Sequence, residues 1–154
     1  EFRRVLFRSA SAAQPIVLLA RHDHPLARRG GAATVHDVMA YPLALMPESY
    51  GIGHAARMLE FAENIRIRPT LVTNSLSALK QFVAYDDFVT LIGQFAAYRE
   101  VAAGSLATVP IDHPLFRGTQ ARLLVKAGRP LPAAALEVLA FIQHRMGIFT
   151  EKSA

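Results

Sequence analysis

The feature that most constrains this fold is an alternation of short apolar runs with longer segments of helical periodicity, from Pro15 to Ile111. This order is typical of an α/β protein in which crossover helices connect the strands of a largely parallel sheet. The chain has 154 residues, 52% of them hydrophobic, and is long enough to bury one packed core. The predicted strands are Ile16 to Ala20, Leu43 to Met46, Thr70 to Thr73, Val89 to Ile92, Leu106 to Pro110 and Ala121 to Lys126.

Several segments have the periodicity or the end signals of helices. The clearest is Gly51 to Ile65, because its apolar residues form one wide stripe and charged residues occupy the other face. Asn74 or Ser75 can cap a second helix. The remaining predicted helices are Gln94 to Ala103, which stops at Gly104, Pro132 to Met146, and one or two turns in VHDVMA before Tyr41 and Pro42.

The composition excludes several classes of function. Without cysteine, the chain has no disulfide, thiolate metal site or cysteine nucleophile, and it fits a reducing compartment. The longest apolar run, Pro15 to Ala20, is far shorter than the roughly 20 residues that cross a bilayer, and no signal-peptide-like stretch opens the chain. The net charge is +5, but Lys and Arg do not cluster as on a nucleic-acid-binding surface. We therefore expect a soluble, cytoplasmic domain without a membrane partner.

The first nine residues, EFRRVLFRS, match nothing in the organisation that follows. They hold Arg3, Arg4 and Arg8 against Glu1. We interpret residues 1–9 as non-native sequence, such as a translated adapter. The alternative is a damaged but native segment, and mass spectrometry of the natural product would distinguish the two.

Two clusters of aspartate and histidine suggest a metal or a catalytic site. His22, Asp23 and His24 are residue types that bind zinc, but no partner follows at a fixed spacing. Asp112 beside His113 suggests a catalytic dyad, yet no GxSxG-type elbow presents a serine. We therefore predict no catalytic residue, no metal site and no cofactor. Each DHP stretch is predicted to be a polar turn in which aspartate and histidine bond to local backbone.

The segment from Pro47 to Gly53 is the most informative for binding. It joins a predicted strand to the N-terminus of the amphipathic helix, where unpaired N–H groups carry a partial positive charge. Glycines there let a ligand approach the backbone, so the loop can hold a carboxylate or a phosphate. It lacks the nucleotide-binding patterns GxxxxGK[ST] and GxGxxG. A simple strand-to-helix connection capped by Ser49 explains this segment nearly as well.

Asn74 and Ser75 form a second polar junction between a predicted strand and a predicted helix. In open α/β sheets, ligands bind in crevices at the carboxyl ends of the strands. The predicted ligand-binding residues are therefore Ser49, Tyr50, Gly51, Ile52, Gly53, Asn74 and Ser75.

From about Pro15 to Gly147 the chain resembles the effector domain of LysR-type transcriptional regulators. The motifs that carry the resemblance are, in order, PIVLLARHDHPLA, a short helix before AYP, LALMPESYGIGHAARMLEF, RPTLVTNSLSALKQFV, REVAAGSLATVPI and ARLLVKAGRPLPAAALEVLAFI. Each motif is weak alone, but this order and spacing are specific. The resemblance implies an α/β fold like the type 2 periplasmic binding proteins, with two lobes joined by two crossing strands. The second lobe would be complete and the first lobe mostly missing.

The resemblance also implies a division of the chain into segments. The strand Ile16 to Ala20 would be the outward crossover. The implied segments are 10–21 as this crossover strand, 22–116 as the second lobe, 117–127 as the return crossover strand, 128–148 as the C-terminal helix of the first lobe, and 149–154 as a tail.

The same resemblance implies the function. A small-molecule inducer, with an organic acid as one candidate class, would bind in the cleft between the lobes, and closure would change how paired regulators sit on DNA. DNA would be bound only through an N-terminal helix-turn-helix that is missing here, and the full-length protein would be a homo-oligomer, a dimer or a tetramer. The alternative function is a solute-binding protein of a transport system. No matched set of acid, base and nucleophile indicates an enzyme.

One stretch departs from the family pattern. Where the family usually has V-x-x-G-x-G, this chain has Val83 to Phe88. Aspartate tolerates the left-handed conformation that a glycine adopts, but Phe88 does so poorly, so we expect a different local turn.

The resemblance also suggests a dimer interface. The helix from Ser75 to Tyr85 would pair with a helix from the first lobe of a partner. We predict that Leu76, Lys80 and Phe82 belong to this interface. The core of the lobe itself would explain most of the apolar residues of this helix, and that alternative stays open.

Overall fold

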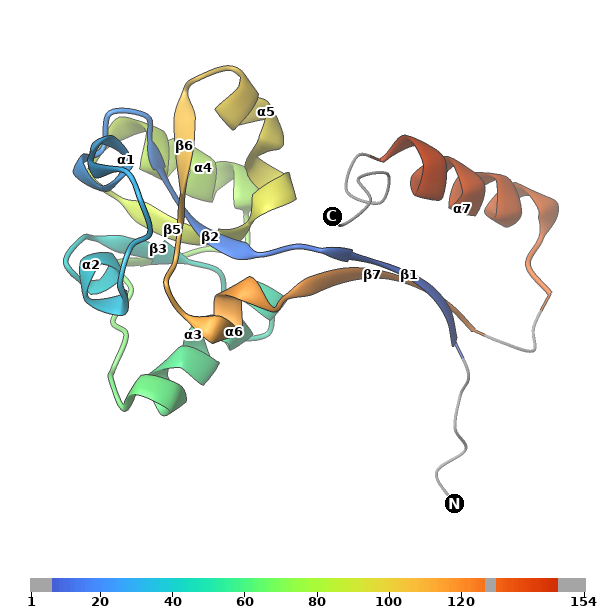
Figure 1. The fold of residues 1–154 in the computed structure, drawn as a ribbon, viewed down its shortest axis with the longest axis horizontal. Helices are drawn as coiled ribbons and strands as arrows, with labels where there is room; N and C mark the ends of the chain where they lie inside the picture. The colour runs from blue at the N-terminus through green and yellow to red at the C-terminus, as the bar shows by residue number, and fades with distance from the viewer. Residues whose placement is uncertain (1–6, 127–129, 147–154) are drawn as a thin grey trace. The chain divides into compact units, whose positions relative to one another are not determined.

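A computed structural model describes residues 7–126 and 130–146 of the chain (Figure 1). The described residues form a larger unit, 15–119, and a smaller unit made of 7–14, 120–126 and 130–146. Across these residues, no helix has the length and apolar character needed to span a bilayer. The elements are, in order, β1 (Phe7–Ala13), β2 (Ile16–Arg21), α1 (Pro25–Arg29), α2 (Val35–Met39), β3 (Leu43–Leu45), α3 (Gly51–Glu63), β4 (Leu71–Val72), α4 (Leu76–Tyr85), β5 (Val89–Gly93), the 3₁₀ helix η1 (Gln94–Ala97), α5 (Tyr98–Ala102), β6 (Leu106–Pro110), α6 (Pro114–Arg117), β7 (Gln120–Lys126) and α7 (Ala133–Arg145).

The larger unit is built on a five-stranded sheet in the order β4-β3-β5-β2-β6. β3 runs parallel to β4 and β5, which confirms the predicted α/β fold. β2 runs antiparallel to both of its neighbours, β5 and β6. The predicted parallel arrangement therefore holds for β4, β3, β5 and β6, and β2 is the exception. Hydrophobic periodicity reports which residues are buried and not the direction in which a strand runs.

Strand β2 supplies side chains to two hydrophobic clusters, one on each face of the sheet. Leu18 and Ala20 belong to a first cluster that also contains residues of α1, α2, α3 and α6. Leu19 belongs to a second cluster with residues of α4 and η1. Successive side chains of a strand point to opposite faces, so a strand that is apolar at every position must be covered on both sides. The helices in Figure 1 provide that cover.

The smaller unit contains the antiparallel ladder of β1 with β7, and helix α7. The ladder ends at the pair of Ala13 with Gln120. Residues 10–21, expected as one crossover strand, are thus divided between β1 and β2, which lie in different sheets. Pro15 stands between the two strands, and its missing N–H group cannot contribute to a ladder. The strand that pairs with β7 is therefore β1 and not Ile16–Arg21.

Two interpreted segments extend beyond the described residues. Of residues 1–9, only 7–9 are described, and they pair with β7 as the first residues of β1. The expected tail, 149–154, lies outside the described residues altogether. Because backbone pairing does not depend on the origin of a sequence, both interpretations of residues 1–9 remain open.

All but one of the predicted helices form as single helices, and local signals set their ends. α3 ends at Glu63, and its C-cap Asn64 adopts the left-handed conformation with φ 50°. Ser75 caps α4 through its side chain, as predicted. The helix predicted over 94–103 is instead two short pieces, η1 and α5, which meet at Ala97 with φ −106° and ψ 7°. Gly104 follows with φ 71°, a conformation that suits glycine after a helix.

The connection from α4 to β5 contains no left-handed residue. Asp86 ends α4 in an extended conformation, with φ −147° and ψ −175°. Between residues 84 and 88, no φ angle is positive. Phe88 is half-buried and packs against the second hydrophobic cluster. The chain thus makes this turn without the conformation that phenylalanine tolerates poorly.

Candidate functional site

The two polar junctions predicted to bind a ligand follow neighbouring strands. β3 and β4 are parallel and pair Leu45 with Val72 at their carboxyl ends. The Thr73 amide then donates to the Leu45 carbonyl oxygen at 3.1 Å. The chain leaves both strands at this edge, once toward α3 and once toward α4. The structure therefore brings residues 46–50 and 73–75 to the same edge of the sheet, where open α/β sheets bind ligands.

The first junction is a closed turn that leads directly into α3. The Tyr50 amide donates to the Pro47 carbonyl oxygen at 2.9 Å, and the His54 amide donates to the Tyr50 carbonyl oxygen at 2.8 Å. The N-cap of α3 is Tyr50 and not Ser49, and it makes no side-chain hydrogen bond to the helix. The alternative of a connection capped by Ser49 therefore does not describe this helix start. The first N–H groups of α3 receive no side-chain cap.

The predicted contact residues of this junction differ in exposure. Ser49 and Gly51 are exposed, and Tyr50 is 42% exposed. Ile52 is half-buried and packs against the first hydrophobic cluster. Gly53 is buried. The junction thus presents two hydroxyl side chains and an exposed glycine to solvent, whereas Ile52 is partly covered and Gly53 is buried.

The second junction combines an exposed amide with a helix cap. Asn74 is exposed. The Ser75 hydroxyl oxygen accepts a hydrogen bond from the Ala78 amide at 3.2 Å, and the Ser75 amide donates to the Thr73 hydroxyl oxygen at 3.2 Å. A hydroxyl has one donor hydrogen and two acceptor lone pairs, so the cap does not consume the donor of Ser75. Ser75 therefore fixes the start of α4 and can still donate to a ligand.

The three predicted interface residues of α4 have different surroundings. Leu76 packs against the second hydrophobic cluster. Lys80 Nζ lies 2.8 Å from Glu100 Oε1, and this bond lowers the pKa of Glu100. Phe82 is 44% exposed, with its ring centroid 5.8 Å from that of Phe88. Phe82 is therefore the most exposed of the three side chains.

The two DHP stretches each start a short helix. His24 Nδ1 accepts a hydrogen bond from the Leu26 amide at 3.1 Å, and His113 Nδ1 accepts one from the Leu115 amide at 3.3 Å. This confirms the prediction that the histidines bond to local backbone. Helices α1 and α6 were not predicted from the sequence, which indicated only a polar turn at each stretch. In both helices, proline follows the capping histidine directly, and its missing N–H group removes no hydrogen bond within the helix there. A capping residue followed by proline was the sequence signal for these helices.

Both histidine rings are buried, and the second ring nitrogen of His113 also forms a hydrogen bond. His113 Nε2 lies 3.0 Å from Glu63 Oε1, and since Nδ1 accepts, Nε2 carries the hydrogen and donates it. His24 is 0% exposed, with its ring centroid 4.4 Å from that of Tyr41. Burial lowers the pKa of His24. Nowhere in the described chain do three His, Asp or Glu side chains gather closely enough to hold a metal ion.

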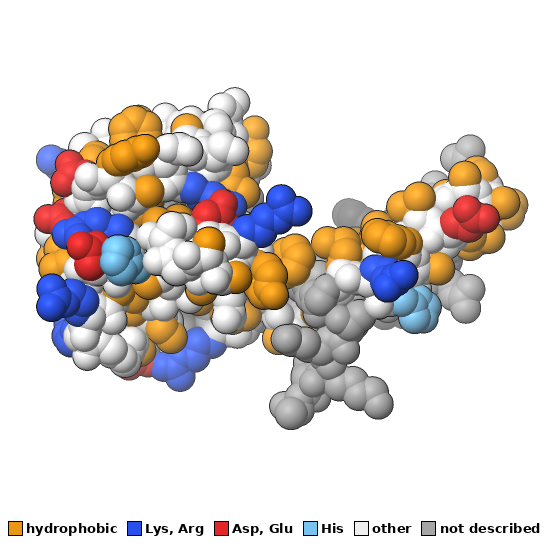
Figure 2. Space-filling model, turned by 90° about the horizontal axis from the view of Figure 1, so that it is seen from above, with side chains coloured by type: hydrophobic (Ala, Val, Ile, Leu, Met, Phe, Trp, Pro, Cys, Tyr) orange, Lys and Arg blue, Asp and Glu red, His pale blue; other side chains and the backbone are white. Residues whose placement is uncertain are grey.

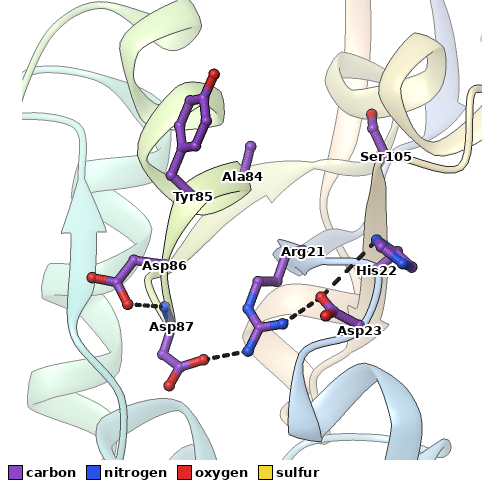
Figure 3. A pocket seen from close by; sticks show the side chains of 8 residues that line it. All are labelled: Arg21, His22, Asp23, Ala84, Tyr85, Asp86, Asp87 and Ser105. Atoms are coloured by element: carbon purple, nitrogen blue, oxygen red, sulfur yellow. Dashed lines mark hydrogen bonds and ion pairs between the residues drawn. The ribbon is translucent and has the colours of Figure 1, made fainter.

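A polar pocket of about 400 Å³ lies at the other end of the sheet. Figure 3 shows the Arg21 guanidinium between the carboxylates of Asp23 and Asp87, and its Nη2 lies 2.7 Å from Asp87 Oδ1. The bond from Arg21 lowers the pKa of Asp23. Arg21 pairs with Leu106 at the start of β6, so this pocket lies at the amino ends of the parallel strands. Its lining consists of Arg21, His22, Asp23, Ala84, Tyr85, Asp86, Asp87 and Ser105.

Charged side chains of both signs are interspersed on the face shown in Figure 2. Ion pairs among the described residues include Arg21 with Asp87 and Lys80 with Glu100. This face therefore lacks the single-sign surface of a nucleic-acid-binding domain.

Comparison with known proteins identifies a matching family and similar folds. The model of the family described as LysR substrate binding domain matches residues 7–147. The CcmR regulatory domain of Synechocystis PCC6803, solved in complex with 2-PG, is 20% identical with a TM-score of 0.73, over 100% of this chain and 72% of that one. The QuiR effector binding domain in complex with shikimate is 14% identical with a TM-score of 0.63, over 88% and 63%. The regulatory domain of MetR, a LysR family regulator from N. meningitidis, is 18% identical with a TM-score of 0.66, over 94% and 65%.

At these identities the structural likeness shows the fold alone. That fold is the periplasmic-binding-protein-like α/β architecture expected from the motif order. The chain spans 72%, 63% and 65% of the three neighbours. No sequence among the curated proteins matches it.

Proposed function

We propose that this chain, which belongs to the LysR substrate binding domain family, is the effector-binding part of a LysR-type transcriptional regulator. The observation that carries the proposal is the meeting of two polar strand-to-helix junctions at one edge of β3 and β4. Two structural neighbours are complexes with small molecules, 2-PG and shikimate, which supports a small-molecule effector here. The family match favours a regulator over the alternative, a solute-binding protein of a transport system.

The proposed effector contacts come from both junctions. Ser49 and Tyr50 are exposed and carry hydroxyl groups, and Gly51 exposes its backbone at the start of α3. The second junction would add the Asn74 amide and the Ser75 hydroxyl. Ile52 is half-buried and would supply an apolar edge. The hydroxyl, amide and backbone groups can each hydrogen-bond to a small polar molecule without a conformational change in the strands that precede the junctions.

The start of α3 favours an effector with an acid group. The first turn of this helix contains no acidic residue, and its N-cap Tyr50 makes no side-chain bond to it. Its first N–H groups are therefore available to an anion, and the helix dipole adds a partial positive charge. We accordingly propose an organic acid as the effector class.

In the whole regulator, the effector would bind between two lobes. Residues 22–116 would belong to the second lobe, 117–127 to the return crossover strand, and 128–148 to a helix of the first lobe. DNA would be bound by a helix-turn-helix that precedes this segment, and the regulator would act in the cytoplasm as a homo-oligomer. LysR-type regulators are generally not enzymes, and we propose no catalytic role for this chain.

A calorimetric titration of the full-length regulator tests the proposed function. The probes are 2-PG, shikimate and a series of other small organic acids. We expect saturable binding of at least one acid, and a loss of about tenfold or more in affinity on combining Ser49→Ala with Gly51→Val, since a removed hydrogen bond and a blocked backbone each weaken binding. Ser105→Ala is the control, because this exposed serine lines the pocket at the opposite end of the sheet. Binding unchanged by the double substitution would remove the assignment.

The proposed oligomer interface on α4 is tested by sedimentation of the full-length protein. Phe82→Glu should raise the dimer dissociation constant, because a two-fold contact repeats the introduced charge. Lys80→Glu is the less informative variant, because it also breaks the pair with Glu100 inside the lobe. Phe61→Glu is the control, since Phe61 is 70% exposed on α3. Equal dissociation constants for both phenylalanine variants would remove α4 from the interface.

A further inference from the structure

Gly53 lies in the first turn of α3 and is enclosed by the backbone of the preceding turn. A Cβ atom placed on Gly53 would lie 2.2 Å from the Pro47 carbonyl oxygen, 2.5 Å from the Pro47 carbonyl carbon and 2.6 Å from the Met46 carbonyl oxygen. These separations are far shorter than the van der Waals contact of about 3.5 Å. All three atoms belong to the backbone and cannot rotate away as the end of a side chain can. Any side chain at position 53 therefore requires the chain at 46–47 to move.

Gly51, two residues earlier in the same turn, has different surroundings. Apart from its chain neighbours and the backbone of its own helix, no atom lies within 4 Å of a Cβ placed on Gly51, and its backbone is not in the left-handed region. Alanine therefore fits at this position without displacing the chain. Two glycines of one turn thus differ, because a side chain is excluded at Gly53 and tolerated at Gly51.

The backbone group that Gly53 accommodates also holds the turn together. The Pro47 carbonyl oxygen accepts the hydrogen bond from the Tyr50 amide at 2.9 Å. Ser49 lies between these two residues, and Tyr50 is the N-cap of α3. Displacing the Pro47 carbonyl would lengthen this bond and move both hydroxyl-bearing residues. A methyl group at position 53 would act on residues that it does not touch.

We infer that Gly53 is a positioning residue of the effector site. Its missing side chain lets the Pro47 carbonyl group lie against the first turn of α3, and this sets the positions of Ser49 and Tyr50. Gly53 does not offer its Cα side to an effector, because the chain itself occupies that space. The part of the inference that concerns affinity rests on the proposed function, whereas the part that concerns the turn does not.

The turn is tested first, by amide hydrogen exchange of this chain. In Gly53→Ala the Tyr50 amide should exchange about tenfold faster than in the wild-type chain, because the bond to Pro47 is strained or lost. In the matched control, Gly51→Ala, the Tyr50 amide should keep its protection to within about twofold. Equal protection of Tyr50 in the two variants would overturn the inference.

A second measurement covers the case in which Gly53→Ala does not fold. A scalar coupling across the hydrogen bond from the Tyr50 amide to the Pro47 carbonyl group is measured in the unsubstituted chain. An observed coupling supports the close approach of Pro47 to the start of α3. Exchange of the Tyr50 amide at the rate of an unstructured peptide would overturn it.

The affinity is tested with shikimate and 2-PG as probes of the full-length regulator, at a temperature where circular dichroism shows each variant to be folded. Gly53→Ala should weaken probe binding about tenfold. Gly118→Ala should leave it unchanged, because a Cβ there meets only ordinary contact at 3.6 Å. A disturbed turn with unchanged affinity would refute the positioning role but not the proposed function. A wild-type regulator that binds neither probe would count against the proposed function and the affinity part of the inference, and the Tyr50 exchange data would still decide the part that concerns the turn.

Discussion

The larger and the smaller unit differ most in what their elements bury. In residues 15–119, Leu18, Leu19 and Ala20 of β2 are each 0% exposed, between helices on both faces of the sheet. In the smaller unit, α7 has no buried residue, and its large apolar side chains include Leu136, Val138 and Phe141 at 51%, 58% and 62% exposure. Figure 2 shows hydrophobic side chains, in orange, at the surface of this helix.

This difference shows which unit has the packing to hold its own structure. Most of the stability of a protein helix comes from packing of its apolar face and not from propensity. Helices α1, α2, α3, α4 and α6 of the larger unit have that packing among the described residues, and α7 does not. We therefore expect that the larger unit dominates unfolding and that α7 needs further apolar surface, as the first lobe of a two-lobed regulator would provide.

The largest expected effect is that of a truncation in the core. Leu18→Ala should lower the free energy of unfolding of the larger unit by about 3 kcal/mol, because it leaves a cavity at a fully buried position. The same substitution in the smaller unit, Leu136→Ala, should change it by less than about 0.5 kcal/mol. Urea unfolding followed by circular dichroism measures both. Similar effects at the two positions would break the comparison between the units.

An acid-sensitive stability is the next largest effect, and it also belongs to the larger unit. His24 is fully buried, and burial lowers its pKa below the ordinary value of 6.5. At pH values between the lowered pKa of His24 in the folded chain and its ordinary pKa in the unfolded chain, the unfolded chain binds more protons than the folded chain. Stability is therefore fully present above about pH 6.5 and falls as the pH drops below it, by at most about 1.4 kcal/mol per pH unit.

The measurement is a series of urea unfolding curves at about pH 7.5, 6.5 and 5.5. His24→Asn is the control, because asparagine can still accept the hydrogen bond from the Leu26 amide but does not titrate. The wild-type chain should lose more stability on acidification than this variant. Parallel pH profiles of the two chains would show that His24 does not contribute.

Burial and element type could be predicted from the sequence where residues repeat with a regular period. Leu106–Pro110 was predicted with the bounds that the structure has, and β2 was recognised because Ile16 to Ala20 is apolar throughout. The antiparallel direction of β2 could not be predicted, since it depends on which strands lie beside it. Helices α1 and α6 have five and four residues, which is too short for periodicity to show.

The candidate site could be predicted as a region but not in its internal geometry. The two junctions meet because β3 and β4 are adjacent, which follows from a parallel α/β sheet. The pattern of two glycines did not reveal that a side chain is excluded at Gly53 and tolerated at Gly51, because the difference comes from how the preceding turn places the Pro47 carbonyl group. The pair of Arg21 with Asp87 joins residues 66 positions apart and leaves no local signal.

The starts of the helices provide a smaller test of the same comparison. α4 is capped by the Ser75 hydroxyl, whereas the N-cap of α7, Pro132, makes no side-chain bond. Ser75→Ala should lower the unfolding free energy by about 1 kcal/mol, the usual contribution of a serine cap. Pro132→Ser should leave it unchanged, because α7 packs too little to contribute to the main transition. Thermal unfolding in the absence of effector measures both, and a clear change on Pro132→Ser would show that α7 is coupled to the larger unit.

The smallest effect on stability, and a distinct effect on assembly, is expected for the apolar face of α7. Exposed apolar side chains on a helix promote association, so the wild-type chain should self-associate as its concentration rises. Combining Leu136→Ser with Phe141→Ser should reduce this association while changing the unfolding free energy by less than about 0.5 kcal/mol. The matched control combines Ala134→Ser with Ala140→Ser, which are exposed positions of the same helix with little apolar surface to lose. Sedimentation velocity over a range of concentrations distinguishes the three chains. A wild-type chain that stays strictly monomeric and unfolds in one sharply cooperative transition would show that α7 already has the packing it needs, and the two units would then be alike.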